Sequence, residues 1–547
     1  MPRSRLARAA ALAVALAVSC AVPPAAAHPR PGPPADPTAP VVRVEGGAVQ
    51  GSVSADGRRF LGIPYAAAPA GALRFAPPRP AARWDGVRDA TATPPSCAQS
   101  ALATVEDCLV VNVHTPPAAA GASARRGLPV MVWFHGGAYT VGSAAGYDPT
   151  PLVTRGGVIV VGVNYRLGPL GFLTLPGRGR DGVANAAVLD QQAALRWVRR
   201  NVAAFGGDPR NVTIFGESAG GHSVCMQLIS PGARGLFRRA ISQSGACTDG
   251  GLGPAPRAEA EATSLRYAAT VGCTDPASAL ACLRAKPVAE LLAAGGGLLS
   301  LDWVPVVDGA VIPRATREAL ATGRYNHVPM IVGSNHDEGR LFVWLQYHLG
   351  LGRAVTQAEY EAGVRRSAGG DPARAAAALA RYTPAAYGSR DLAMAAAMTD
   401  STFACPAVET AAAAARRRPF RSRQPVYQYE FADPQAPVMF PDALMPLGAY
   451  HSAELYYLFA TLQGIPPFTP LTPAQRQLSD EMIRAWTAFA RTGDPNAGGA
   501  PAGVLGWPSV RGRDPAVLSL RPGGTSRLVR TVDDEHQCAF WLSPTTG

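Results

Sequence analysis

The sequence predicts an α/β protein in which a large, mainly parallel β-sheet is flanked by helices. Two observations predict this class. Short apolar runs rich in β-branched residues recur along the chain, and segments with helical periodicity lie between them. Hydrophobic residues make up 47% of the 547 residues and charged residues only 16%. This composition allows a large buried core and excludes a largely disordered chain.

Four apolar runs are the expected strands of the sheet. Each is bounded by glycine or polar residues, as expected for a strand that is covered on both faces. The runs are residues 129–134, 158–163, 212–215 and 328–332.

Several helices are expected around these strands. Between the second and third runs, residues 187–205 place apolar side chains at helical spacing and end at Gly206-Gly207-Asp208-Pro209, a strong helix stop. A late amphipathic helix is expected over residues 473–491. The alanine-rich stretches 375–380 and 411–415 are also expected to be helical.

The amino-terminal end has the pattern of a secretory signal peptide. Three arginines precede an apolar run over residues 9–22, and Ala25-Ala26-Ala27 then offers small residues for cleavage. We therefore expect a signal peptide over residues 1–27, a proline-rich leader over 28–40 and a single domain over 41–547, in a secreted, extracellular protein. Cys20 leaves open a lipoprotein alternative, which Ala17 disfavours because a bulkier aliphatic residue is expected there.

Charge and hydropathy exclude two classes of partner. The net charge is +12 (51 − 39), but Lys286 is the only lysine and the arginines are scattered, with no concentrated footprint for a nucleic acid. We expect no nucleic-acid partner. After the signal peptide no segment has 18 uninterrupted apolar residues, so no stable membrane insertion is expected.

The cysteine count indicates disulfides. Without Cys20 eight cysteines are left, an even number in an oxidising compartment. Cys97 and Cys108, and likewise Cys273 and Cys282, are close enough to close short loops, and neither pair has the C-x-x-C spacing of a zinc or redox site. The remaining cysteines cannot be paired from spacing alone; they are Cys225, Cys247, Cys405 and Cys538.

Residues 216–220 form a G-x-S-x-G motif around Ser218. The third expected strand leads directly into it and a helix is expected over residues 220–229, which is the context in which such a serine acts as a nucleophile. The flanking glycines suit a tight strand-to-helix turn. The helix N-terminus directs N–H groups at developing negative charge.

A second glycine turn follows the first expected strand, at His135-Gly136-Gly137-Ala138. Alone it would be a plain turn, but together with Ser218 it is typical of an oxyanion hole. We expect the N–H groups of Gly137, Ala138 and Ala219 to bind the oxyanion, with Gly136 shaping the turn.

A nucleophilic serine also needs a base and an acid, in the chain order serine, acid, histidine. Asp337 and Glu338 lie just after the fourth expected strand and are both candidates for the acid, and His451 is the candidate base downstream. Four other histidines lack such a context and are expected to be structural or on the surface; they are His114, His327, His348 and His536.

Several ordered motifs resemble the type-B carboxylesterase/cholinesterase family of α/β-hydrolases, over about residues 41–541. The motifs are Glu106-Asp107-Cys108-Leu109, residues 135–138, Asn164-Tyr165-Arg166-Leu167-Gly168, residues 206–220, Gly493-Asp494-Pro495-Asn496 and Cys538-Ala539-Phe540-Trp541. The resemblance implies an α/β-hydrolase fold with helical insertions over the active site. It also implies a carboxylic-ester hydrolase that acts on a small-molecule ester through an acyl-enzyme, without cofactor or metal.

The resemblance also assigns particular residues. The family's acid falls on Glu338, and its base, a histidine followed three residues later by glutamate, falls on His451. Its disulfides fall on Cys97–Cys108, Cys273–Cys282 and Cys405–Cys538. Cys225 and Cys247 are outside the family pattern, so they either pair with each other or are two buried thiols.

Two departures from the family narrow the expected activity. The loop between Cys97 and Cys108 contains no aromatic residue, so it offers no cation–π floor for a quaternary ammonium and a cholinesterase activity is not expected. The third residue of the oxyanion turn is Ala138 rather than glycine.

Because the serine, the acid and the histidine are all present, we expect catalysis on short- to medium-chain or aryl esters. A lipase for longer acyl chains and a non-catalytic binding or adhesion module are the alternatives. Residues 341–468 are expected to cover the gorge.

Overall fold

A computed structural model describes residues 39–543 of the chain, with gaps. The gaps are residues 101–102, 118–126, 178–183, 249–251, 298–299, 417–423, 440–443, 500–505, 512–515 and 531. The expected signal peptide, most of the leader and Cys20 lie outside the described residues.

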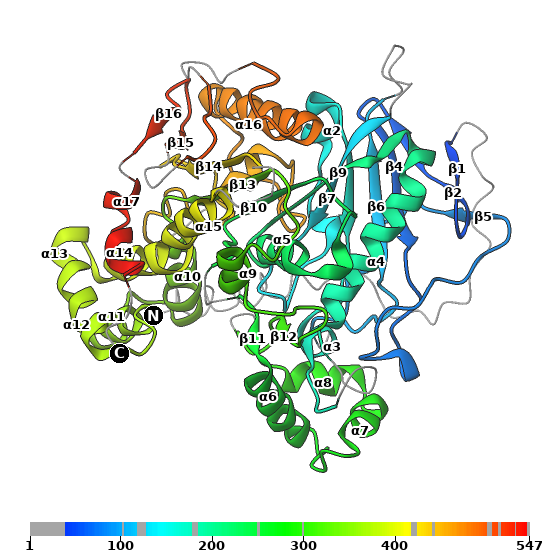
Figure 1. Cartoon of the computed structure of the whole chain (residues 1–547), viewed down its shortest axis with the longest axis horizontal. Helices are drawn as coiled ribbons and strands as arrows, with labels where there is room; N and C mark the ends of the chain where they lie inside the picture. The colour runs from blue at the N-terminus through cyan, green and yellow to red at the C-terminus, as the bar shows by residue number, and fades with distance from the viewer. Residues whose placement is uncertain are drawn as a thin grey trace, which may run out of the picture.

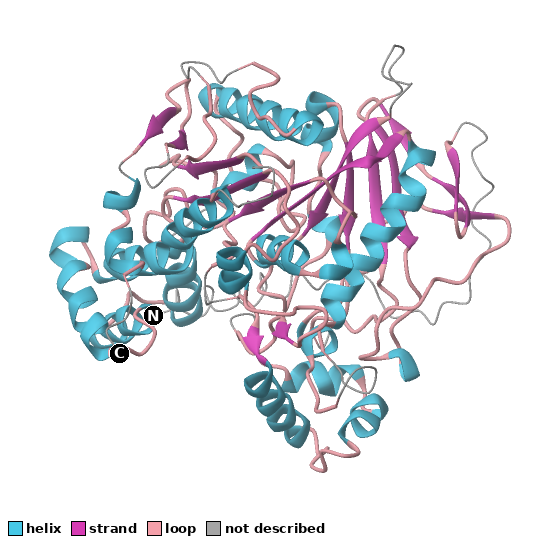
Figure 2. Cartoon of the chain, in the orientation of Figure 1, coloured by secondary structure: helices cyan, strands magenta, loops and turns pink. Residues whose placement is uncertain are grey.

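A twisted sheet of 11 described strands forms the centre of the molecule (Figure 2). Its order is β16-β15-β14-β13-β10-β9-β7-β8-β6-β4-β3. In that order the strands are Arg527–Val529, Val517–Leu520, Val426–Phe431, Met330–Asn335, Arg239–Gln243, Gly207–Glu217, Leu128–Phe134, Ile159–Val163, Val110–Thr115, Gly57–Pro64 and Ser52–Ser54.

Seven neighbouring strands of this sheet, from β15 to β8, run parallel to one another. The strands at the two edges pair antiparallel. The predicted α/β class with a large, mainly parallel sheet is therefore confirmed. Two small sheets accompany it: β1 (Val41–Val44), β2 (Gly47–Gln50) and β5 (Val87–Asp89) form one, and β11 (Ala255–Pro256) with β12 (Val306–Val307) forms the other.

Helices cover both faces of the sheet (Figure 1). Along β7 the side chains of Val130 and Val132 join one apolar cluster, and those of Met131 and Trp133 join the other, as the two-residue period of a strand requires. The first cluster includes buried residues of α4 (Ala186–Asn201) and α5 (Ala219–Ile229), and the second includes those of α16 (Pro473–Thr492).

The other described α-helices lie around these. They are α2 (Thr150–Gly156), α3 (Gly168–Phe172), α6 (Arg257–Thr270), α7 (Ala279–Ala285), α8 (Val288–Ala294), α9 (Thr316–Thr322), α10 (Gly339–Val343), α11 (Gln357–Ser367), α12 (Pro372–Arg381), α13 (Pro384–Tyr387), α14 (Arg390–Met398), α15 (Cys405–Ala415), α17 (Val532–Glu535) and α18 (Cys538–Trp541). In Figure 1, α6 to α8 lie together at the bottom of the view and α11 to α14 at the lower left.

All of the expected elements are present, but some of their ends differ. The third expected strand is longer, because β9 already begins at Gly207 and continues through Gly216 to Glu217. The fourth begins later and ends later, since β13 covers Met330–Asn335. The expected helix over 187–205 is α4 followed by a 3-10 turn, Val202–Phe205, and the chain leaves it at Gly206 with a φ of 92°.

Four disulfides join described residues. Three are the pairs that the resemblance implies: Cys97–Cys108, Cys273–Cys282 and Cys405–Cys538. The fourth joins Cys225 on α5 to Cys247, which resolves the alternatives that the sequence left open. In the part of the chain that the structure describes, no helix is long and apolar enough to cross a membrane.

Candidate active site

Ser218 occupies a strained turn between β9 and α5. Its backbone has φ 56° and ψ −125°, a region that non-glycine residues rarely adopt. The turn is tight because α5 begins directly against the end of β7: a Cβ on Gly220 would lie only 1.9 Å from the Phe134 carbonyl oxygen. A Cβ on Gly216 would lie 2.5 Å from the backbone of Gly220. The two glycines of the motif are therefore required by backbone contacts, and they set the position of Ser218.

The second glycine turn lies beside this serine because β7 and β9 are neighbours in the sheet. A Cβ on Gly136 would be 3.2 Å from Cβ of Ser218, so the two turns are in direct contact. Gly137 has φ 106° and Ala138 φ 52°, so successive residues after β7 have positive φ. Ala219 is the first residue of α5 and is fully buried. The structure thus brings together the backbone segments that the sequence predicted for an oxyanion hole.

His451 lies between β14 and the 3-10 turn Ala453–Tyr457, and its imidazole is buried against Glu338. Nδ1 of His451 is 2.6 Å from Oε2 of Glu338. The other oxygen of Glu338 accepts a hydrogen bond of 2.8 Å from the backbone N–H of Asn335, the last residue of β13. Glu338 is thereby fixed by the strand end and orients the histidine ring.

Asp337, the other candidate acid, points to different partners. It forms an ion pair of 2.8 Å with Arg340 and accepts a hydrogen bond from the backbone N–H of Ala449. Among the described residues, the histidine that Asp337 contacts is His336 and not His451. The geometry favours Glu338 as the residue that orients His451.

Nε2 of His451 lies 3.2 Å from Oε1 of Glu217, the residue directly before Ser218. Within the described residues no hydrogen bond joins the Ser218 hydroxyl to His451. The hydroxyl of Ser452 donates to the same Glu217 oxygen over 2.6 Å.

Glu217, Glu338 and Glu454 form a buried acidic cluster around the imidazole. Burial lowers the pKa of His451, but the negative charges of Glu217 and Glu338 outweigh it and raise this pKa to about 9. Burial, together with the charge of Glu217, raises the pKa of Glu454 to about 8. Burial raises the pKa of Glu217 as well, and the nearby His451 offsets part of that rise. The surroundings therefore stabilise the protonated form of the His451 ring.

Two aromatic rings of the helical insertion lie against the histidine. The ring of Phe342, on α10, is 4.9 Å from that of His451, and the ring of Phe403 is 5.0 Å from it. Phe403 comes from a π-helical turn between α14 and α15. The segment 341–468, which also contains β14 of the central sheet, thus contributes both rings to the candidate site from its helical part.

Sequence reasoning missed Glu217 and both phenylalanines. The only signal for Glu217 was its place inside the G-x-S-x-G motif, and the phenylalanines had none.

A parallel sheet with a serine on the turn between β9 and α5 is the architecture of an α/β-hydrolase. The family model described as "Carboxylesterase family" matches residues 38–541, and the chain belongs to this family.

Among curated proteins, an acylcarnitine hydrolase of Mus musculus is 36% identical, over 88% of this chain and 87% of its own length. A cocaine esterase of Homo sapiens is 35% identical, over 92% and 91%. A para-nitrobenzyl esterase of Bacillus subtilis is 34% identical, over 93% and 99%.

Solved structures of esterases are also similar to this chain. A PNB esterase superposes with a TM-score of 0.75 at 32% identity, over 92% of this chain and all of the other. A thermophylic PNB esterase gives 0.76 at 31% identity, with the same coverage. The chain is a carboxylic-ester hydrolase with the α/β-hydrolase fold.

Proposed function

We propose that Ser218, Glu338 and His451 are the catalytic triad and that this enzyme cleaves esters through an acyl-enzyme. The observation that supports this best is the 2.6 Å contact between His451 Nδ1 and Glu338, with Ser218 on its strained turn beside Gly136. The resemblance of the motifs to the family's triad supports the same roles.

In the first step Oγ of Ser218 attacks the ester carbonyl carbon while Nε2 of His451 takes the hydroxyl proton. Glu338 holds the ring and stabilises its positive charge. The N–H groups of Gly137, Ala138 and Ala219 bind the oxyanion. His451 then passes its proton to the leaving alcohol. Water, activated by the same histidine, hydrolyses the acyl-enzyme and restores Ser218.

The proposed substrates are short- to medium-chain or aryl esters. This proposal rests on two supports: the printed names of the relatives, which include a para-nitrobenzyl esterase and a cocaine esterase, and the Phe342 and Phe403 rings beside His451. A lipase for long acyl chains is the competing enzyme. The alternative of a binding module without catalysis loses its basis, because the chain belongs to a family of esterases.

One experiment tests both the triad and the substrate class. Hydrolysis of p-nitrophenyl esters from acetate to palmitate is measured for the wild type and for Ser218→Ala. We expect a short- to medium-chain optimum, no rise above the concentration at which the substrate forms micelles, and a kcat lower by about 10³-fold or more in the variant. Ser367→Ala, on α11, serves as the control and should match the wild type.

An unchanged rate in Ser218→Ala would exclude the triad as written. A palmitate optimum with activation above the micelle concentration would support the lipase instead.

The protein is further proposed to be secreted after cleavage following Ala27. Four disulfides are consistent with an oxidising compartment. Amino-terminal sequencing of protein from the culture medium should begin at His28. Recovery of the protein from the membrane fraction with a lipid-modified Cys20 would contradict this.

A further inference from the structure

A cluster of two histidines and one glutamate lies next to the candidate triad but outside it. His336 belongs to the turn after β13, Glu430 to β14, and His536 to the segment between α17 and α18. One nitrogen or oxygen atom of each lies within 4.8 Å of the others. From the sequence, His536 was expected to be structural or on the surface and His336 had no role of its own, because nothing in the sequence places the three side chains together.

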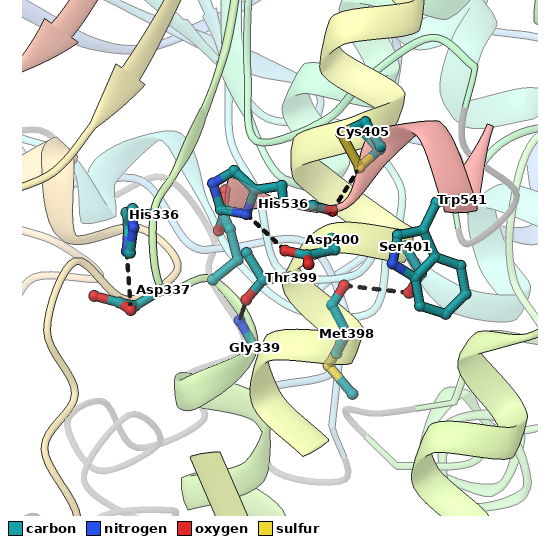
Figure 3. Close-up of polar contacts among 12 residues, drawn as sticks. His336, Asp337, Gly339, Met398, Thr399, Asp400, Ser401, Cys405, His536 and Trp541 are labelled. Carbon is teal, nitrogen blue, oxygen red and sulfur yellow. Dashed lines mark hydrogen bonds and ion pairs between the residues drawn. A yellow bond between two sulfur atoms is a disulfide. The ribbon is translucent and has the colours of Figure 1, made fainter. Parts of the chain in front are cut away.

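In both histidines Nδ1 faces a carboxylate. Nδ1 of His536 is 2.6 Å from a carboxylate oxygen of Asp400, and Nδ1 of His336 is 3.2 Å from one of Asp337. Figure 3 shows each histidine beside its aspartate. A histidine whose Nδ1–H donates to a carboxylate can bind a metal ion through Nε2 once Nε2 carries no proton, and this pairing fixes the tautomer of most metal-binding histidines. It occurs here twice within one cluster.

The cluster carries more buried negative charge than the neighbouring arginines balance. Asp400 and Glu430 are 3% and 2% exposed, so both carboxylates are withdrawn from water. Nε2 of His536 is already 2.6 Å from a Glu430 oxygen. Asp337 forms an ion pair with Arg340, and the positive charge of Arg521 lowers the pKa of Glu430. With both imidazoles neutral, the two buried carboxylates exceed the nearby positive charge, which either protons on the rings or a bound cation can supply.

We propose that Nε2 of His336, Nε2 of His536 and a carboxylate oxygen of Glu430 bind a divalent transition-metal ion such as Zn²⁺, with water in the fourth position. Two imidazoles and one carboxylate form a ligand set that suits zinc, whereas calcium and magnesium prefer oxygen ligands alone. On binding, the proton between His536 Nε2 and Glu430 leaves to solvent and the ion takes its place.

The required movements are small. Tetrahedral zinc sites have metal–ligand distances of about 2.0–2.2 Å, so the ligand atoms must lie roughly 3.3 Å apart. The His536–Glu430 contact widens slightly from its present 2.6 Å. One imidazole nitrogen of His336 lies within 4.8 Å of the other two ligand atoms, so the His336 ring must approach and turn its Nε2 toward them. The side chain of His336 is 40% exposed and lies in a turn, so it can make most of this movement.

The ion connects three parts of the chain that are distant in sequence. His336 is two residues before Glu338, and His536 is two residues before Cys538, which is bonded to Cys405 on α15. A bound ion therefore fastens the turn that carries Glu338 to β14 and to the carboxyl-terminal segment. This predicts a stabilising site and not a participant in ester hydrolysis.

Isothermal titration of the untagged, chelator-treated protein with ZnCl₂ tests the proposal. We expect one Zn²⁺ per chain with a Kd below about 10 µM. His336→Gln should weaken binding by 10-fold or more, and Asp400→Asn, which removes the partner of His536 Nδ1, by about 10- to 100-fold. His327→Gln is the matched control, because His327 is also a half-buried histidine, and its Kd should equal that of the wild type.

A second measurement does not depend on calorimetry. Because a ligand that binds only the folded state raises the unfolding temperature, ZnCl₂ should raise the midpoint for the wild type and for His327→Gln but much less for His336→Gln. His336 is partly exposed in a turn, so this variant should fold, as circular dichroism will show. Absence of stoichiometric binding to the wild type, or an unchanged Kd in His336→Gln, overturns the proposal and leaves a network of carboxylates and protonated imidazoles.

Discussion

Glu217 is a residue that the G-x-S-x-G motif leaves unspecified, yet its carboxylate lies 3.2 Å from His451 Nε2. Its charge would have two opposite effects on His451 if this residue acts as the proposed general base. It stabilises the protonated ring that forms during proton transfer, and it raises the pKa of His451, so that less of the neutral base is present at low pH. At the scale of residues, we therefore expect the neighbours of the proposed triad to set the pH dependence of the enzyme.

Glu217→Gln should therefore shift the acid limb of kcat/KM to lower pH, by about one unit. The neutral amide no longer raises the pKa of His451, so the unprotonated base persists at lower pH. Glu454→Gln should shift the limb in the same direction but less, because Glu454 contributes less to this pKa. A pH–rate profile with a p-nitrophenyl ester measures both shifts. A limb that stays in place, or moves to higher pH, would show that Glu217 does not control the base.

At the scale of elements, the apolar runs predicted the strands well but not their ends. β13 continues past the apolar run to Asn335, whose side-chain amide donates to Glu454 over 2.7 Å and to the Tyr450 carbonyl over 2.8 Å. A hydropathy pattern assigns such a polar residue to a loop. Asn335 is nevertheless fully buried, and its side-chain N–H groups are hydrogen-bonded. The carboxyl ends of the strands carry the site, so the pattern fails where function requires buried polar groups.

The close contact between β7 and α5 predicts that a larger residue at position 220 lowers activity. Gly220→Ala places a Cβ only 1.9 Å from the Phe134 carbonyl oxygen. Because that oxygen and the Cα that carries the new Cβ both belong to the backbone, the clash cannot be relieved without shifting the start of α5. We expect a loss of esterase activity of about 100-fold or more, since displacements of about 1 Å at a reacting group have this effect. The unfolding temperature should also fall.

Gly297→Ala is the control for this substitution. Among the described residues no atom lies within 4 Å of its added Cβ, and its backbone does not have a positive φ, so activity and unfolding temperature should match the wild type. Wild-type activity in Gly220→Ala would mean that the turn tolerates a wider separation of β7 and α5.

Across the whole molecule, the sequence alone suggested the proposed triad in the order serine, acid and histidine, whereas it gave no sign of the partners that lie in other segments. Phe342 and Phe403 contact His451 through the helical insertion, and Cys225 meets Cys247 across 22 residues. These contacts depend on how the insertion packs against the sheet. A single sequence has no periodicity or spacing that reports such packing.

The longest covalent link among the described residues is Cys405–Cys538, which spans 133 residues and fastens the carboxyl-terminal α18 to α15. In the chain-entropy model, a disulfide stabilises by restricting the unfolded chain, so a loop of this length contributes about 5 kcal/mol, and the 11-residue separation of Cys97–Cys108 contributes about 3 kcal/mol. Replacing Cys405 and Cys538 by serine should therefore lower the midpoint of urea unfolding more than replacing Cys97 and Cys108. An equal or reversed order would mean that native contacts of the two segments, and not loop length, decide the stability that each disulfide adds.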